Sequence, residues 1–215
     1  MISDELQGII SQMLKPLRDI PLNVVVEGLT GHKVIPFNKR SKKDPKVLEV
    51  LKRVADEVMQ EVNRKGIIKS RPNEVGNAIE PFVVAHLNAV ENYEAHTPVA
   101  VSGRKKATGY PDIAFTDEFG RLNYLECKTF NIKNIDTAQR SFYLSPSKDF
   151  KITADAHHFG MSFEIYHDGN AGDEHIYKIR SWKILDLSKL KLSIKYEFNA
   201  DNKKLYDKKL ILAEK

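Results

Sequence analysis

The sequence predicts an α/β protein, with helices concentrated toward the N-terminus and strands in the remainder of the chain. Two observations lead to this expectation. Apolar residues recur at spacings of three and four in the N-terminal part, which is typical of helices that bury one face. From Tyr93 onward, short apolar runs alternate with glycine, asparagine and aspartate, which is typical of strands joined by turns.

The N-terminal third is expected to hold two amphipathic helices around a β-leaning stretch. Residues 3–14 should form the first helix, because Leu6 and its apolar neighbours follow helical spacing. Leu22–Phe37 favours extended structure interrupted by glycine and proline. Residues 44–64 should form the second helix, with Asp44 as its N-cap and a proline at its first position.

A third helix should precede the strands. It is expected to begin near Asn73 and to reach Val90, with a kink or a late start at Pro81, which removes one helical hydrogen bond. The strands expected next are Tyr93–Val101, Ile113–Phe115 and Leu122–Thr129, the last two joined by a turn at Asp117–Gly120. The remaining elements are expected to be a short helix around Thr153–His158 and strands at Met161–His167, Ile176–Leu185, Leu190–Phe198 and Leu205–Leu212.

The segment from Gly109 to Phe130 contains the charged residues that point to chemistry. Side chains alternate across a strand, so Glu126 and Lys128 should share one face. In an antiparallel pair, Asp112 should lie beside them. Two carboxylates and an ammonium among apolar residues are costly to assemble unless something uses them, as a divalent metal and a phosphate would. The alternative is a surface hairpin with an exposed ion pair, which does not explain the apolar neighbours.

Pro111-Asp112, followed after thirteen residues by Glu126-Cys127-Lys128, resembles the PD-(D/E)xK signature of the restriction-endonuclease-like nuclease superfamily. The resemblance implies a central mixed sheet flanked by helices, built on a core of one helix, three strands, a helix and a strand. This nuclease core would span residues 73–167 of a single domain that covers residues 1–215. Residues 1–72 would be an N-terminal helical elaboration and residues 168–215 a C-terminal β elaboration.

The resemblance also implies roles for individual residues. Asp112 and Glu126 would bind Mg²⁺, with the backbone carbonyl of Cys127 as a further ligand. Lys128 would hold the attacking water or the scissile phosphate. Family members often carry a glutamate on the first core helix, and Glu80 would be that fourth catalytic residue, with Glu74 as the alternative.

The expected function is that of a type II restriction enzyme, a sequence-specific endonuclease that hydrolyses double-stranded DNA with Mg²⁺. One site per chain and two strands to cut suggest a homodimer. Two alternatives stay open from the sequence. One is a structure-selective nuclease, such as a junction resolvase or a repair nuclease. The other is a DNA-binding module without catalysis, against which the complete set of Asp112, Glu126 and Lys128 speaks.

Charge favours a polyanionic partner, since the net charge is +5 and the pI about 9.1. Arg104, Lys105 and Lys106 precede the Asp112 strand and suit a phosphate clamp. A polar stretch interleaved with aromatic residues follows the Glu126 strand and is placed to lie along DNA. Its candidate DNA-binding residues are Arg140, Ser141, Tyr143 and Lys148. Each charge run is otherwise a solvated face.

Composition excludes several classes of protein. No apolar run approaches the ~20 residues of a membrane span, and the polar N-terminus does not resemble a signal peptide, so a cytoplasmic protein is expected. The single cysteine, Cys127, excludes an internal disulfide and is expected to pack in the core. Structural zinc is not expected, because His157-His158 is the one adjacent pair of histidines and no ligand spacing accompanies it.

Overall fold

The computed structural model divides the chain into two units, Met1–Ile20 with Lys191–Lys215 and Pro21–Leu190. Residues 4–13, 15, 17–106, 108–136, 141–196, 200–205 and 207–213 are described. The first unit contains the helix α1 (Asp4–Met13), the paired strands β1 (Leu17–Pro21) and β9 (Lys191–Ile194), and the short helix α5 (Asn202–Leu205). The helix expected over residues 3–14 is thereby confirmed. The strand expected at Leu205–Leu212 is wrong, since Leu205 ends α5 and residues 208–210 form a turn.

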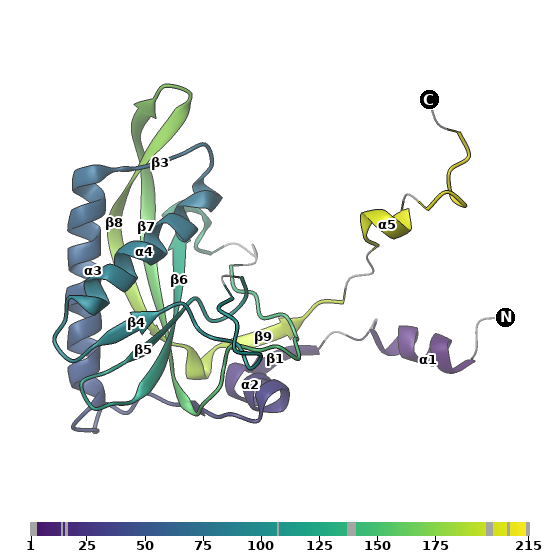
Figure 1. Ribbon diagram of the computed structural model, residues 1–215, viewed down its shortest axis with the longest axis horizontal. Coiled ribbons are helices and arrows are strands. Elements are labelled where there is room, and N and C mark those ends of the chain that lie inside the picture. Colours follow the sequence, from purple (N-terminus) through teal and green to yellow (C-terminus); the bar gives the residue numbers. More distant parts are fainter. Residues whose placement is uncertain are drawn as a thin grey trace. The chain divides into compact units, whose positions relative to one another are not determined.

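A seven-stranded mixed sheet forms the centre of the second unit (Figure 1). Its order is β3-β8-β7-β6-β5-β4, and β2 pairs with β7. The β6–β7 and β2–β7 pairs are parallel and the others antiparallel, which confirms the expected central mixed sheet. The strands are β2 (Val34–Ile35), β3 (Ile67–Lys69), β4 (Glu94–His96), β5 (Ile113–Thr116), β6 (Leu122–Phe130), β7 (Ala156–Ala171) and β8 (Glu174–Asp186).

Two helices, α3 (Asp44–Lys65) and α4 (Val75–Asn88), pack against each other and against the sheet (Figure 1). Both confirm the helices expected at these places, and α4 continues through Pro81 after a 3₁₀ turn at Pro72–Glu74. Their apolar faces meet Leu125, Cys127 and neighbouring strand residues in one core. Full burial of each large aliphatic side chain contributes roughly 1.5–3 kcal/mol, so this layer fixes α4 over β6.

Residues 22–30 form a helix, α2 (Leu22–Thr30), and the extended structure expected over Leu22–Phe37 is wrong for this part. The run of valines favours a strand locally, but Leu22 and Val26 are four residues apart and both are fully buried. Gly31 then ends the helix in the left-handed conformation, at φ 76°, and its N–H donates to the carbonyl of Glu27. Tertiary burial therefore overrides β propensity here.

Asp44 is the first residue of α3 and not its N-cap, which is Lys43. Its carboxylate is used elsewhere. It accepts hydrogen bonds from the Asn38 N–H at 2.9 Å and from the Arg121 guanidinium at 2.8 Å. Arg121 also binds Asp117 at 2.9 Å, so a buried ionic network joins the start of α3 to the turn between β5 and β6.

The helix expected around Thr153–His158 is wrong, because β7 begins at Ala156 and continues to Ala171. His157 and His158 lie opposite Asn123 and Tyr124 of β6, so backbone pairing in the sheet determines their conformation. The strand expected at Tyr93–Val101 shortens to Glu94–His96, followed by one isolated bridge between Val99 and Lys105.

Candidate active site

Asp112 precedes β5 and is joined directly to β6. Ile113 lies opposite Leu125 in the antiparallel pair, so the residue before it reaches the middle of β6. There the Asp112 carboxylate accepts a hydrogen bond from the backbone N–H of Cys127 at 2.9 Å. This bond fixes one oxygen of Asp112 against the centre of the predicted motif.

Glu126 and Lys128 form an ion pair beside Asp112. The distance from the Lys128 Nζ to the Glu126 Oε1 is 2.6 Å, and the glutamate side chain is 5% exposed. Burial raises the pKa of Glu126 to about 7, and the neighbouring Asp112 carboxylate adds to the shift. Burial alone would lower the pKa of Lys128, but Glu126 and Asp112 raise it above its ordinary value.

Glu80 comes from α4, on the turn of helix that follows the buried Ile79. Its side chain is half-buried. Burial raises the pKa of Glu80 to about 7, with a further rise from the charge of Asp112. The structure therefore brings together all four predicted catalytic residues, Glu80, Asp112, Glu126 and Lys128, from one helix and two strands.

Cys127 contributes to the site through its backbone N–H, which donates to Asp112. Its thiol points into the core between the sheet and the helices, and burial raises its pKa well above the ordinary value. A buried neutral thiol is a packing group, as expected from the sequence.

A further lysine, Lys151, lies close to the same carboxylates and was not singled out from the sequence. Its side chain is 2% exposed. Burial lowers the pKa of Lys151, and the charges of Asp112, Glu126 and Glu80 oppose that shift. No local pattern marks this lysine, because its burial results from the folding of the segment that precedes β7.

Aromatic residues wall the site next to Asp112. The Tyr110 hydroxyl and the Nδ1 of His158 form a hydrogen bond of 2.6 Å, and burial lowers the pKa of that imidazole to about 3. The imidazole of His158 is therefore neutral near pH 7. The ring of Phe142 packs edge-on against Tyr110 with centroids 5.0 Å apart, which holds residues 141–143 beside the strand of Asp112.

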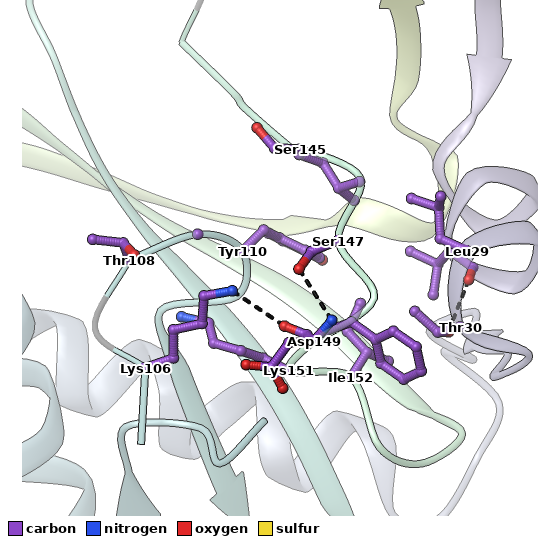
Figure 2. Close-up of a pocket in the computed structure, with 14 residues that line it drawn as sticks. Leu29, Thr30, Lys106, Thr108, Tyr110, Ser145, Ser147, Asp149, Lys151 and Ile152 are labelled. Atoms are coloured by element: carbon purple, nitrogen blue, oxygen red, sulfur yellow. Dashed lines mark hydrogen bonds between the residues drawn. The ribbon is translucent and has the colours of Figure 1, made fainter. Parts of the chain in front are cut away.

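A small cavity of about 50 Å³ adjoins this wall (Figure 2). It lies between α2, the loop that carries Lys106 and Tyr110, and the segment 144–152. Lys106 and Lys151 both line it, and the Lys106 Nζ donates to the backbone carbonyl of Asp149 at 3.2 Å. The other polar residues that line it are Thr30, Thr108, Tyr110, Ser145, Ser147 and Asp149.

The predicted DNA-binding residues are found in two segments. Arg104 and Lys105 are exposed and Lys106 is half-buried. Ser141, Tyr143 and Lys148 are exposed on the segment held by Phe142. Arg140 lies outside the described residues.

The residues present fit a divalent cation. One oxygen of Glu126, Oε2, is buried and has no hydrogen-bond partner in the described part of the chain. Asp112 lies within hydrogen-bond reach of the same carboxyl, so a cation between the two would relieve their repulsion. Among the described residues no three histidine, cysteine or acidic side chains already form a metal cage. Mg²⁺ needs none, since it binds through one or two carboxylates and takes waters and phosphate as its other ligands.

Comparisons with known proteins give the family of the chain. Residues 16–209 match the model of the type II restriction enzyme MjaV family. The type II restriction enzyme MjaV of Methanocaldococcus jannaschii is 41% identical over 227 aligned positions, which cover 99% of this chain and 96% of that protein. No solved structure matches the chain. None of the helices in the described part of the chain combines the length and the apolar character needed to cross a bilayer. The chain belongs to the MjaV family of type II restriction enzymes.

Proposed function

We propose that Glu80, Asp112, Glu126 and Lys128 form the catalytic centre with which this type II restriction enzyme hydrolyses double-stranded DNA, and that its metal is Mg²⁺. The observation that carries the proposal is the buried, unpartnered oxygen of Glu126 beside Asp112. Burying the Glu126 carboxylate beside the half-buried Asp112 costs free energy unless a cation binds them.

Asp112 and Glu126 would hold the metal, with the Cys127 carbonyl as a further ligand. When bound, the metal supplies a water of lowered pKa and a Lewis acid for the phosphoryl oxygens. The hydrogen bond from Cys127 orients Asp112 for this task. Glu80 would accept a hydrogen bond from a water at the edge of the site that faces α4.

Lys128 would orient the attacking water or bind the scissile phosphate. Its ion pair with Glu126 holds the ammonium at the carboxylates, so it is positioned before DNA arrives. Preorganised charge at the reacting phosphate is usually the largest contribution to such catalysis.

Arg104, Lys105 and Lys106 would neutralise DNA phosphates on one side of the centre. Arg140, Ser141, Tyr143 and Lys148 belong to the segment beside Tyr110 and would contact the duplex along its grooves or backbone. We further propose that two chains associate as a homodimer, because each chain carries one centre and two strands are cut. The cytoplasm, where foreign DNA is encountered, is the proposed compartment.

The test is a digest of plasmid DNA with Mg²⁺ by the wild type and by Asp112→Asn. The wild type is expected to give discrete bands, and the variant none, while binding of the same DNA persists by gel shift. Cleavage by Asp112→Asn at the wild-type rate would remove Asp112 from the centre. A smear of random lengths from the wild type would contradict sequence-specific cutting.

A further inference from the structure

Lys151 is a buried cation that the described residues leave unpaired. Its side chain is 2% exposed, and its Nζ makes no hydrogen bond to any described residue. A buried ammonium that lacks partners costs several kcal/mol in general, so a fold retains one where a ligand completes it.

The other buried charges among the described residues have partners. Asp44 and Asp117 both bind Arg121. Glu164 accepts a hydrogen bond from Ser181 at 2.7 Å and contacts Arg180. Lys151 therefore differs from these paired charges. In the part of the chain that the structure describes, no carboxylate makes a hydrogen bond with its Nζ.

The surroundings of Lys151 identify the missing anion. Its electrostatic neighbours are the carboxylates of Asp112, Glu126 and Glu80, while Lys106 repels it. If balancing these carboxylates were its whole purpose, the ammonium should pair with one of them, as Lys128 pairs with Glu126 at 2.6 Å. The ammonium is near the carboxylates but not bound to them, and the cavity that Lys151 lines offers space for another group.

That group must be negatively charged, because it has to balance a buried ammonium. The cavity beside Lys151 is lined by serine and threonine residues, by a second lysine, Lys106, and by Asp149, whose carboxylate accepts a hydrogen bond from the Ser102 N–H (Figure 2). Two lysines and hydroxyl groups are donors that suit an oxyanion. In a DNA endonuclease the anion at this place is the phosphate that is cut.

We propose that Lys151 is a second catalytic lysine, whose ammonium donates a hydrogen bond to a non-bridging oxygen of the scissile phosphate. The inference rests on the proposed function. During the reaction a water oxygen bonds to phosphorus and releases a proton to solvent, the bond from phosphorus to the leaving oxygen breaks, and the leaving oxygen takes up a proton from solvent. Lys151 keeps its protons and stabilises the charge that accumulates on the phosphoryl oxygens.

The first test compares Lys151→Met with the wild type in single-turnover cleavage with Mg²⁺. Methionine keeps most of the length and removes the charge, and cleavage should fall about 10²–10³-fold. Lys52→Met, at a surface lysine of α3 that pairs with Glu49, is the matched control and should cleave like the wild type. Lys52→Met should keep the Tm of the wild type, and Lys151→Met should have a Tm equal to or above it, because it removes a buried unpaired charge. Lys151→Gln carries the same expectation and replaces Lys151→Met if that variant does not fold.

A second test separates contact with the phosphate from a structural role. A duplex that carries the site mapped by the digest is made with a neutral methylphosphonate at the scissile position. Binding is measured by fluorescence anisotropy with Ca²⁺ in place of Mg²⁺. The wild type should bind the natural duplex about 10-fold more tightly than Lys151→Met, and the two should bind the neutral duplex equally. The same gap on both duplexes would overturn the proposal.

Asp112→Asn is assayed in parallel to separate the two proposals. Loss of cleavage in Asp112→Asn with wild-type cleavage in Lys151→Met would refute the role of Lys151 and leave the catalytic centre intact. Wild-type cleavage in Asp112→Asn would refute the centre itself, and the inference with it.

Discussion

The carboxylate of Asp112 accepts a hydrogen bond from the backbone N–H of Cys127 at 2.9 Å, and this contact joins the two halves of the PD-(D/E)xK motif. Residues fifteen positions apart in the sequence are thereby fixed to each other before any metal binds. The backbone, not a side chain, supplies the donor, so the geometry is as rigid as the strand pair of β5 and β6.

Two substitutions at Asp112 should therefore differ in their effect on stability. In Asp112→Asn the amide oxygen still accepts from Cys127, so the free energy of unfolding should stay within about 1 kcal/mol of wild type. Asp112→Ala leaves that N–H unpaired and should cost about 1–3 kcal/mol. Urea unfolding measures both. Equal losses in the two variants would show that the hydrogen bond is not what Asp112 contributes to the fold.

Glu80 should affect the response to metal more than the binding of DNA. Glu80→Gln removes a charge that lies close to Asp112, and the Mg²⁺ concentration for half-maximal cleavage should rise roughly 10-fold, the scale of an outer-sphere partner. Glu74→Gln, at the exposed turn before α4, is the control and should behave as the wild type. A raised Mg²⁺ requirement in Glu74→Gln with a wild-type requirement in Glu80→Gln would show that Glu74, and not Glu80, acts at the metal.

The stability of the fold should depend on pH through Asp44. Burial alone would raise its pKa, but hydrogen bonds from Arg121 and Asn38 and the charges of His157 and Arg121 lower it below the ordinary 3.8. A lowered folded-state pKa means that the stabilisation is complete above the unfolded pKa and is lost as pH falls through the folded one. Urea unfolding between pH 6 and pH 2 should show a loss below about pH 4 that is smaller in Asp44→Asn.

Arg121→Met provides the independent check on this network. It leaves two buried carboxylates, Asp44 and Asp117, without their cation and should destabilise the fold by about 3 kcal/mol at pH 7. An unfolding free energy equal to that of the wild type would show that the network adds no net stability.

The basic loop should govern how DNA binding responds to salt. Replacing Arg104, Lys105 and Lys106 by glutamine should lower the slope of log K against log salt by about 0.9 for each DNA phosphate that the variant no longer neutralises. Anisotropy titrations over a range of NaCl concentrations give this slope. An unchanged slope would remove the loop from the DNA interface.

The strand pair and the motif residues could be predicted from the sequence because the patterns that determine them lie within one short segment. Strand alternation, the turn at Asp117–Gly120 and the spacing from Asp112 to Glu126 are all contained in one short segment. The helices α3 and α4 were predicted for a similar reason, since each carries a continuous apolar face.

The features that the sequence did not predict depend on distant parts of the chain. Residues 22–30 are helical because Leu22 and Val26 are buried, against the β preference of their valines. His157 and His158 are extended because they pair with β6. Lys151 is the same case at the site: no neighbour in sequence distinguishes it from an exposed lysine, and its burial beside Asp112 results from tertiary structure alone.

The central claim is that Asp112 and Glu126 together bind a divalent cation at which DNA is cut. Anomalous diffraction from crystals grown with Mn²⁺, an ion that occupies the same oxygen sites as Mg²⁺, tests it most directly. The account predicts one peak bridging the two carboxylates, at about 2.0–2.3 Å from an oxygen of each, and its loss in Asp112→Asn. A peak elsewhere in the protein, with none between these carboxylates, would contradict it.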